Sequence, residues 1–193
     1  MNREIRSGEI VNINCKYSYI DTTPPVEEDG REIIKTGTEK MDTPIHQDLK
    51  RAFINIIPHF ILLCEQVEET KEIRNAIKDG IPEGIIPTTS IFYPYNVHQF
   101  EVKGSSKKEG VSFKGTRILR TGEVLNLTFS RINWDDNDYP YMAELIEAVE
   151  ILKEETYLYT QGKQQPPPPD LQEAMDFDSL DMSVAAVDDN GEI

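Results

Sequence analysis

The stretch from residue 102 to 121, VKGSSKKEGVSFKGTRILRT, holds six lysines and arginines against one glutamate, in a chain whose formal net charge is −15. The six cations are Lys103, Lys107, Lys108, Lys114, Arg117 and Arg120. Several aromatic residues are close in sequence: Phe92, Tyr93, Tyr95, Phe100 and Phe113. Cations that follow phosphates, beside aromatic rings that stack on bases, are what binding of a single-stranded nucleic acid requires. The stretch therefore predicts a nucleic-acid interface in which the six cations contact phosphates and Phe113 stacks on bases together with Tyr93 or Tyr95.

A second interpretation of the same residues stays open. Lysines on a solvated hairpin require no ligand, and Phe100 and Phe113 can belong to the hydrophobic core. The basic stretch is then an ordinary exposed hairpin rather than a binding groove.

The histidines and the acidic turn do not form a recognisable metal motif. A zinc-binding helix places two histidines four residues apart, and His46, His59 and His98 have no such spacing. The turn DDND at residues 135–138 offers carboxylates, but it lacks the closing glutamate of a twelve-residue calcium loop. Its simpler interpretation is an exposed turn whose Asp138 caps the following helix. We expect neither a metal nor a cofactor.

No enzyme signature occurs in the sequence. The G-x-S-x-G elbow, the P-loop and the dinucleotide-binding fingerprint are all missing, and the glycines at 104, 110, 115 and 122 fall between expected strands. Cys15 and Cys64 are too few and too far apart for a disulfide framework or a zinc site, and we expect both to be buried thiols in a reducing compartment. The sequence does not predict an enzyme.

The elements that would position these residues follow from apolar periodicity. Alternation of apolar and polar residues predicts strands over residues 9–21, 32–40, 90–104, 109–119 and 123–134. A 3.6-residue period predicts a long helix capped by Thr43 and kinked near Asn55 by Pro58, a short helix over 70–80, and a last helix that ends near Gly162. The expected fold is α+β, with a mostly antiparallel sheet, a long kinked helix, a short helix and a C-terminal helix, followed by a disordered acidic tail.

The composition divides the chain into three parts. We expect an α+β domain over residues 1–165, a polyproline spacer over 166–169 and a disordered tail over 170–193, which holds eight carboxylates and no lysine or arginine. No run of 18 apolar residues and no apolar leader occur, so we expect no membrane contact and a cytoplasmic location. A negative domain argues against bulk binding to duplex DNA, although it leaves room for a local basic groove.

The tail combines acidic and apolar residues in a pattern that is typical of tails that dock other proteins. Its segment DFDSLDM alternates acids with apolar residues: Asp176, Phe177, Asp178, Leu180 and Asp181. Together with the spacer and the basic hairpin, this layout resembles small single-stranded-DNA-binding proteins of bacteria and phages. The resemblance implies that the tail docks replication or recombination proteins and shields the DNA groove. The rest of the chain looks like a phage or prophage protein, which would place it in the host cytoplasm.

The resemblance leaves the fold open. An oligonucleotide-binding barrel has five strands and at most one prominent helix, whereas this chain inserts two helices after the first strands and adds another at the end. Either the barrel is elaborated or the fold is a different α+β sheet.

The leading functional expectation is a single-stranded nucleic-acid-binding accessory protein of DNA replication or recombination, with single-stranded DNA as its partner. The alternative is an acidic protein-interaction module that mimics nucleic acid or inhibits a host factor, which the net charge of −15 supports directly. The oligomeric state stays undetermined by the sequence.

Overall fold

The computed structural model describes residues 3–21, 26–28, 31–33, 36–104, 108–136 and 138–164, with no side-chain detail for residues 26–33. Its main sheet has six strands: β1 Arg3–Val11, β2 Asn14–Asp21, β5 Thr36–Lys40, β6 Tyr95–Lys103, β7 Gly110–Ile118 and β8 Val124–Asn133. The strand order is β5-β2-β1-β6-β7-β8, and every neighbouring pair is antiparallel. The sheet is open, with β5 and β8 at its edges, so the elaborated barrel is wrong and the α+β sheet is confirmed. A small separate hairpin joins β3 Val26–Glu28 and β4 Arg31–Ile33.

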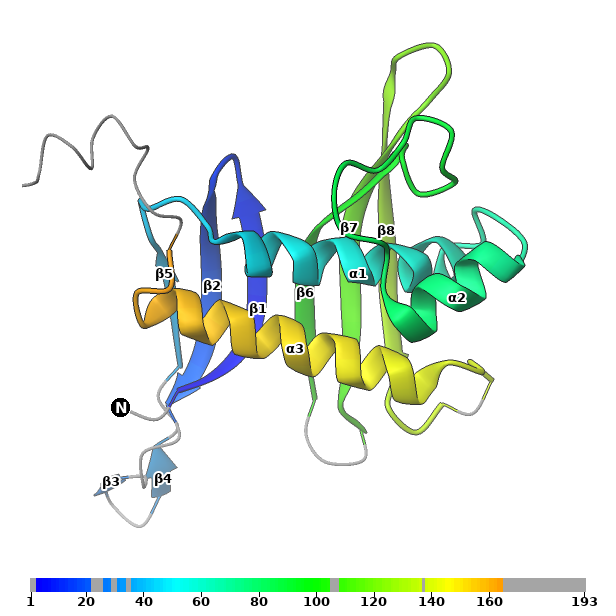
Figure 1. Cartoon of the computed structure of the whole chain (residues 1–193). Coiled ribbons are helices and arrows are strands. Elements are labelled where there is room, and N and C mark those ends of the chain that lie inside the picture. Colours follow the sequence, from blue (N-terminus) through cyan, green and yellow to red (C-terminus); the bar gives the residue numbers. More distant parts are fainter. Residues whose placement is uncertain are drawn as a thin grey trace, which may run out of the picture.

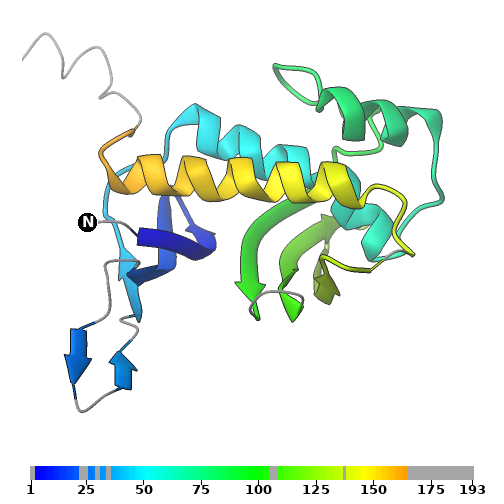
Figure 2. The same cartoon turned by 90° about the horizontal axis from the view of Figure 1, so that it is seen from below.

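Two long helices cover the same face of this sheet (Figures 1 and 2). They are α1 Gln47–Leu63 and α3 Met142–Thr160, and the short α2 Lys71–Asp79 packs beside α1. The start of α1 lies next to the end of α3, where the Tyr159 hydroxyl donates to the Thr43 carbonyl. Lys163 joins the same ends through ion pairs of 2.7 Å to Asp48 and 2.8 Å to Glu155. The opposite face of the sheet carries no helix among the described residues.

The core lies between the sheet and the two long helices. Alternate strand residues point into it, as the period of two requires, and meet the apolar faces of α1 and α3. Fully buried members include Cys15, Leu49, Ile56, Phe60, Phe100, Val111, Leu145, Val149, Leu152 and Tyr159. Pro58 lies inside α1, which continues as one helix to Leu63.

A narrow seam joins the two halves of the sheet. Strand β1 pairs with β6 only over Ser7–Glu9 and Gln99–Glu101, whereas it pairs with β2 along its whole length. Gly8 is opposite Phe100 at the centre of this seam, and a Cβ atom at Gly8 would lie 2.7 Å from Cε1 of Phe100. Only a residue without a side chain lets the buried Phe100 ring pass across β1 at this distance.

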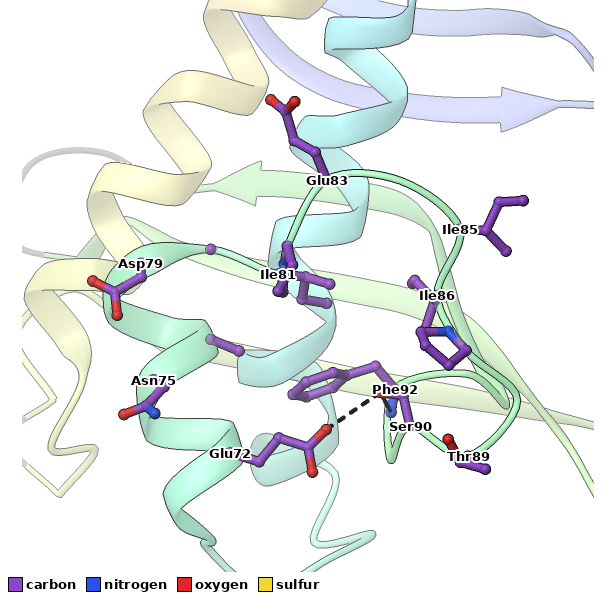
Figure 3. A pocket seen from close by; sticks show the side chains of 14 residues that line it. Glu72, Asn75, Asp79, Ile81, Glu83, Ile85, Ile86, Thr89, Ser90 and Phe92 are labelled. Carbon is purple, nitrogen blue, oxygen red and sulfur yellow. Dashed lines mark hydrogen bonds between the residues drawn. The ribbon is translucent and has the colours of Figure 1, made fainter.

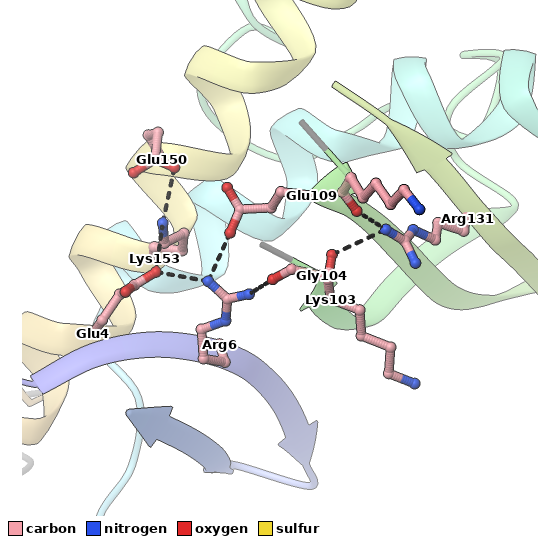
Figure 4. A network of polar contacts seen from close by, with 9 residues as sticks. Glu4, Arg6, Lys103, Gly104, Glu109, Arg131, Glu150 and Lys153 are labelled. Atoms are coloured by element: carbon pink, nitrogen blue, oxygen red, sulfur yellow. Dashed lines mark hydrogen bonds and ion pairs between the residues drawn. The ribbon is translucent and has the colours of Figure 1, made fainter. Parts of the chain in front are cut away.

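An arginine reinforces the seam at one end of the three pairs (Figure 4). Arg6 sits at a register shift in β1, and its guanidinium binds Glu4 at 2.8 Å, Glu109 at 2.6 Å and the Gly104 carbonyl at 2.7 Å. Lys153 of α3 is 3.9 Å from the same Glu4 carboxylate. These contacts tie β1, the β6–β7 hairpin and α3 together where strand pairing is shortest.

Three local expectations are wrong. The strand expected over residues 9–21 is broken by a turn at Asn12, whose φ of 60° lies in the left-handed region that asparagine tolerates. His46 rather than Thr43 caps α1, because its ring nitrogen accepts from the Asp48 amide at 3.2 Å. The last helix starts after Tyr141 without a side-chain cap, and Asp138 lies outside it.

The seam generates the first prediction. Gly8→Ala should lower the free energy of unfolding by about 1–3 kcal/mol, because the added methyl group overlaps a ring that is packed on every side. Phe100→Leu shortens that side chain and so reduces the overlap with the added methyl group. In the double variant, the two losses of unfolding free energy should therefore be less than additive. Urea denaturation of both single variants and of the double variant measures these free energies. Strict additivity would contradict a direct clash at the seam.

Candidate nucleic-acid interface

The face of the sheet that the helices leave bare is lined mainly by hydroxyl, amide and lysine side chains. Residues paired across antiparallel strands share a face, so the pairs alternate between the core and the bare face. The hydroxyl and amide members are Ser7, Ser18, Thr36, Thr38, Asn96, Gln99, Ser112, Thr116, Asn126 and Thr128. The charged members are Lys16, Lys40, Lys103 and Lys114, with Glu9 and Glu101 against them. The bare face is therefore net positive, although the chain is strongly acidic.

Two of these lysines form no ion pair among the residues that the structure describes. Lys103 forms an ion pair with Glu101 at 2.9 Å, and Lys40 is 3.9 Å from Asp42. Neither Lys16 nor Lys114 has an ion pair within 4.0 Å in the described part of the chain, and both side chains are exposed. Their ammonium groups are available to an anion in solution.

Two shallow hollows lie on this face. One of about 240 Å³ is lined by Gln99, Glu101, Lys103, Ser112, Phe113, Lys114, Thr128, Phe129 and Ser130. The other, of about 400 Å³, is lined by Arg6, Ser18, Tyr19, Ile20, Thr36, Gly37 and Thr38. They lie over different halves of the sheet, so the β1–β6 seam sets their relative position. Lysine with serine, threonine and glutamine donors is a set that contacts phosphate oxygens.

Helix α3 carries the opposite charge. Helix α3 holds five glutamates against one lysine, and three of those glutamates, at 147, 150 and 154, are exposed. A polyanion is therefore repelled by the outer surface of α3, whereas the lysines of the bare face attract it.

The predicted cations do not form one patch. Lys103 and Lys114 lie on the bare face, whereas Lys108 is exposed in the β6–β7 hairpin and Arg120 in the turn after β7. Arg117 points toward the helix side, donates to Gln66 at 3.2 Å and lies 5.4 Å above the Tyr95 ring. Arg117 is therefore not part of the bare face.

The predicted stacking residues are mostly in the core. Phe113 is 1% exposed and Tyr95 is 6% exposed, so neither ring can stack on a base, and the stacking role expected of them is wrong. Tyr93, which is 48% exposed, is the one of the three with an accessible ring. Alternation along β7 could have shown this, because Phe113 and Lys114 are adjacent and must point to opposite faces.

Several predicted residues lie outside the described part of the chain. They are Lys107 and the tail residues Asp176, Phe177, Asp178, Leu180 and Asp181, together with the spacer at 166–169. Two residues of the bare face, Lys16 and Lys40, were not singled out by the sequence. Lys16 could have been found, since it alternates with the buried Cys15 and Tyr17.

The remaining candidates form no metal site. Within the described residues, no group of three histidine, cysteine or carboxylate side chains could hold a metal ion. Cys15 is buried as expected, whereas Cys64 is only partly buried. Burial raises the pKa of Cys15 to about 12, and partial burial raises that of Cys64 to about 11, which keeps both thiols protonated. Burial lowers the pKa of His98, against a smaller raising effect of Glu9 and with a further lowering by Lys114, so His98 adds little positive charge at neutral pH. In the same part of the chain no helix is both long and apolar enough to cross a membrane.

A larger pocket of about 660 Å³ opens between α2 and the loop that follows it (Figure 3). Its apolar lining includes Ile81, Ile85, Ile86 and Phe92, and its carboxylates are Glu72, Asp79 and Glu83. Glu72 accepts a hydrogen bond from the Ser90 hydroxyl at 3.3 Å, which holds the loop against α2. The pocket suits a ligand that is both apolar and basic.

Comparison with protein-family models, with curated proteins and with solved structures finds no match to this chain. The resemblance to single-stranded-DNA-binding proteins stays a prediction from the tail and the basic hairpin.

The buried histidine gives a pH-dependent prediction. His59 is 1% exposed, its Nδ1 lies 2.9 Å from the Tyr139 hydroxyl, and burial lowers its pKa to about 4. The unfolded chain binds a proton near pH 6.5 and the folded chain does not, so stability is complete above pH 6.5 and falls toward pH 4, by up to about 3 kcal/mol.

His59→Asn should remove this part of the pH dependence, because asparagine can still accept from Tyr139 but does not titrate. Urea denaturation between pH 4 and 7 measures the pH dependence of the unfolding free energy. The control is His46→Asn, which replaces the residue that caps α1 by asparagine, a residue that also caps helices. An unchanged slope in His59→Asn would contradict the assignment.

Proposed function

We propose that this chain is an accessory protein of DNA replication or recombination that binds single-stranded nucleic acid in the cytoplasm. The bare face of the sheet is the binding surface, and the phosphate backbone is what it contacts. The observation that carries the proposal is that Lys16 and Lys114, which form no ion pair within the described part of the chain, lie among hydroxyl donors on one face of an otherwise acidic protein.

The mode of binding follows from the residue types on this face. Lysine, serine and threonine contact phosphates and carry no sequence information, so binding should be tolerant of base sequence. Stacking contributes little, because Tyr93 is the accessible ring among the expected stacking residues. Affinity should therefore depend steeply on salt, with a log–log slope near −0.7 per phosphate contact.

In this proposal the acidic tail regulates access to the lysine face. A segment of this length reaches roughly 30 Å when it is a flexible coil, which exceeds the radius of gyration near 15 Å of a domain of this size. The tail then competes with nucleic acid at high effective concentration and docks partner proteins through its apolar residues.

The test compares charge reversals on the two sides of the molecule. Lys16→Glu with Lys114→Glu should weaken binding of a labelled single strand by at least about tenfold, because two phosphate contacts become repulsions. Lys71→Glu with Lys78→Glu on α2 makes the same charge change on the helix layer and should alter affinity by less than about threefold at moderate salt.

Fluorescence anisotropy measures how tightly each double variant binds the labelled single strand, both in the full chain and in a version stopped after Gln165. The shortened version should bind more tightly than the full chain if the tail competes. Equal loss in the two double variants would contradict the bare-face site, and no binding by either length at low salt would contradict nucleic-acid binding altogether.

A second candidate function rests on the 660 Å³ pocket. Its carboxylates and apolar floor favour a basic, amphipathic segment of a partner protein, which suits an acidic interaction module. Glu72→Gln with Glu83→Gln should then release such a partner while single-strand binding stays unchanged. Loss of both activities in that variant would argue against two separate surfaces.

A further inference from the structure

The two edges of the sheet differ in a way that bears on assembly. The β5 edge is five residues long and includes Glu39 and Lys40, which is how proteins commonly protect an edge. The β8 edge is ten residues long, and its stretch Val124–Ser130 contains no charge and no proline. No strand pairs with the outer side of β8 among the described residues.

The side chains of β8 leave an apolar row uncovered at this edge. Leu125, Leu127 and Phe129 point to the helix side of the sheet, where their partners on β7 are Arg117, Gly115 and Phe113. Leu125 is 42% exposed, and Leu127 and Phe129 pack against the core but are only partly buried. An apolar row beside unpaired backbone groups is a template for another strand.

The sequence of β8 is complementary to itself. If a second copy pairs antiparallel with Leu127 opposite Leu127, then Leu125 faces Phe129 and Asn126 faces Thr128. This regular pairing covers Val124–Ser130, because the register of β8 against β7 shifts between Phe129 and Ile132.

We propose that the chain forms a two-fold dimer through antiparallel pairing of β8 with β8 of a second copy, centred on Leu127. The interface is isologous, as closed two-fold dimers require. Because the two-fold axis is perpendicular to the sheet, the sheets join into one and both bare faces lie on the same side. The dimer does not depend on nucleic-acid binding, although it would extend the lysine face across two copies.

The register is tested by disulfide trapping in the full chain. Leu127→Cys places two thiols opposite each other, within the Cα separation that a disulfide spans, whereas Leu125→Cys places its two copies four residues apart along the strands. With diamide as oxidant, Leu127→Cys should give a covalent dimer on a non-reducing gel and Leu125→Cys should not. Cross-linking of neither or of both would overturn the register.

The pairing is tested separately by sedimentation of the full chain. Its mass should rise toward twice the monomer mass with concentration, and Asn126→Lys with Thr128→Lys should abolish this rise, because like charges then face each other on solvent-exposed positions. Thr36→Lys with Thr38→Lys on the β5 edge is the matched control and should leave it unchanged. The proposal would be overturned if the full chain stays monomeric at every concentration. It would also be overturned if only a version stopped after Gln165 dimerises.

Discussion

The contact between Gly8 and the Phe100 ring, in the short seam that joins β1 to β6, is the interaction on which the arrangement of this molecule depends. Three residue pairs alone connect the first half of the sheet to the second, and the absence of a side chain at Gly8 lets them form over a buried ring. Arg6 compensates for the short pairing by binding Glu4 of its own strand together with Glu109 and the Gly104 carbonyl of the β6–β7 hairpin. The hollows on the bare face belong to different halves, so the same seam determines whether one strand of nucleic acid can contact both.

The two sides of the molecule differ in charge, and this difference determines which surface a polyanion can bind. The helices bury their apolar faces against one side of the sheet and present glutamates outward, while the other side keeps lysines and hydroxyls in water. A polyanion is repelled by the α3 surface and attracted by the lysines of the bare face, even though the net charge is −15. Net charge alone would have pointed to a basic partner, and it is the placement of Lys16 and Lys114 that supports the nucleic-acid proposal.

Periodicity predicted much of the fold, because apolar alternation is a local property of the chain. The α+β class, the antiparallel sheet and the three helical regions all follow from it. The turn at Asn12 was missed because Val11, Ile13 and Cys15 keep the alternation across it, and β1 was missed because its side chains are mostly polar. The pairing of β1 with β6 joins segments far apart in sequence, and no local pattern specifies such a partner. Aromatic residues near lysines wrongly predict stacking by Phe113, because the alternation along β7 buries that ring.

The most direct test of the bare-face proposal is lysine footprinting of the full chain by reductive methylation, with and without a saturating single strand of DNA at low salt. The proposal predicts that Lys16 and Lys114 become protected while Lys71 and Lys78 on α2 react as before. Protection of the α2 lysines, or equal reactivity of all four with and without DNA, would contradict it.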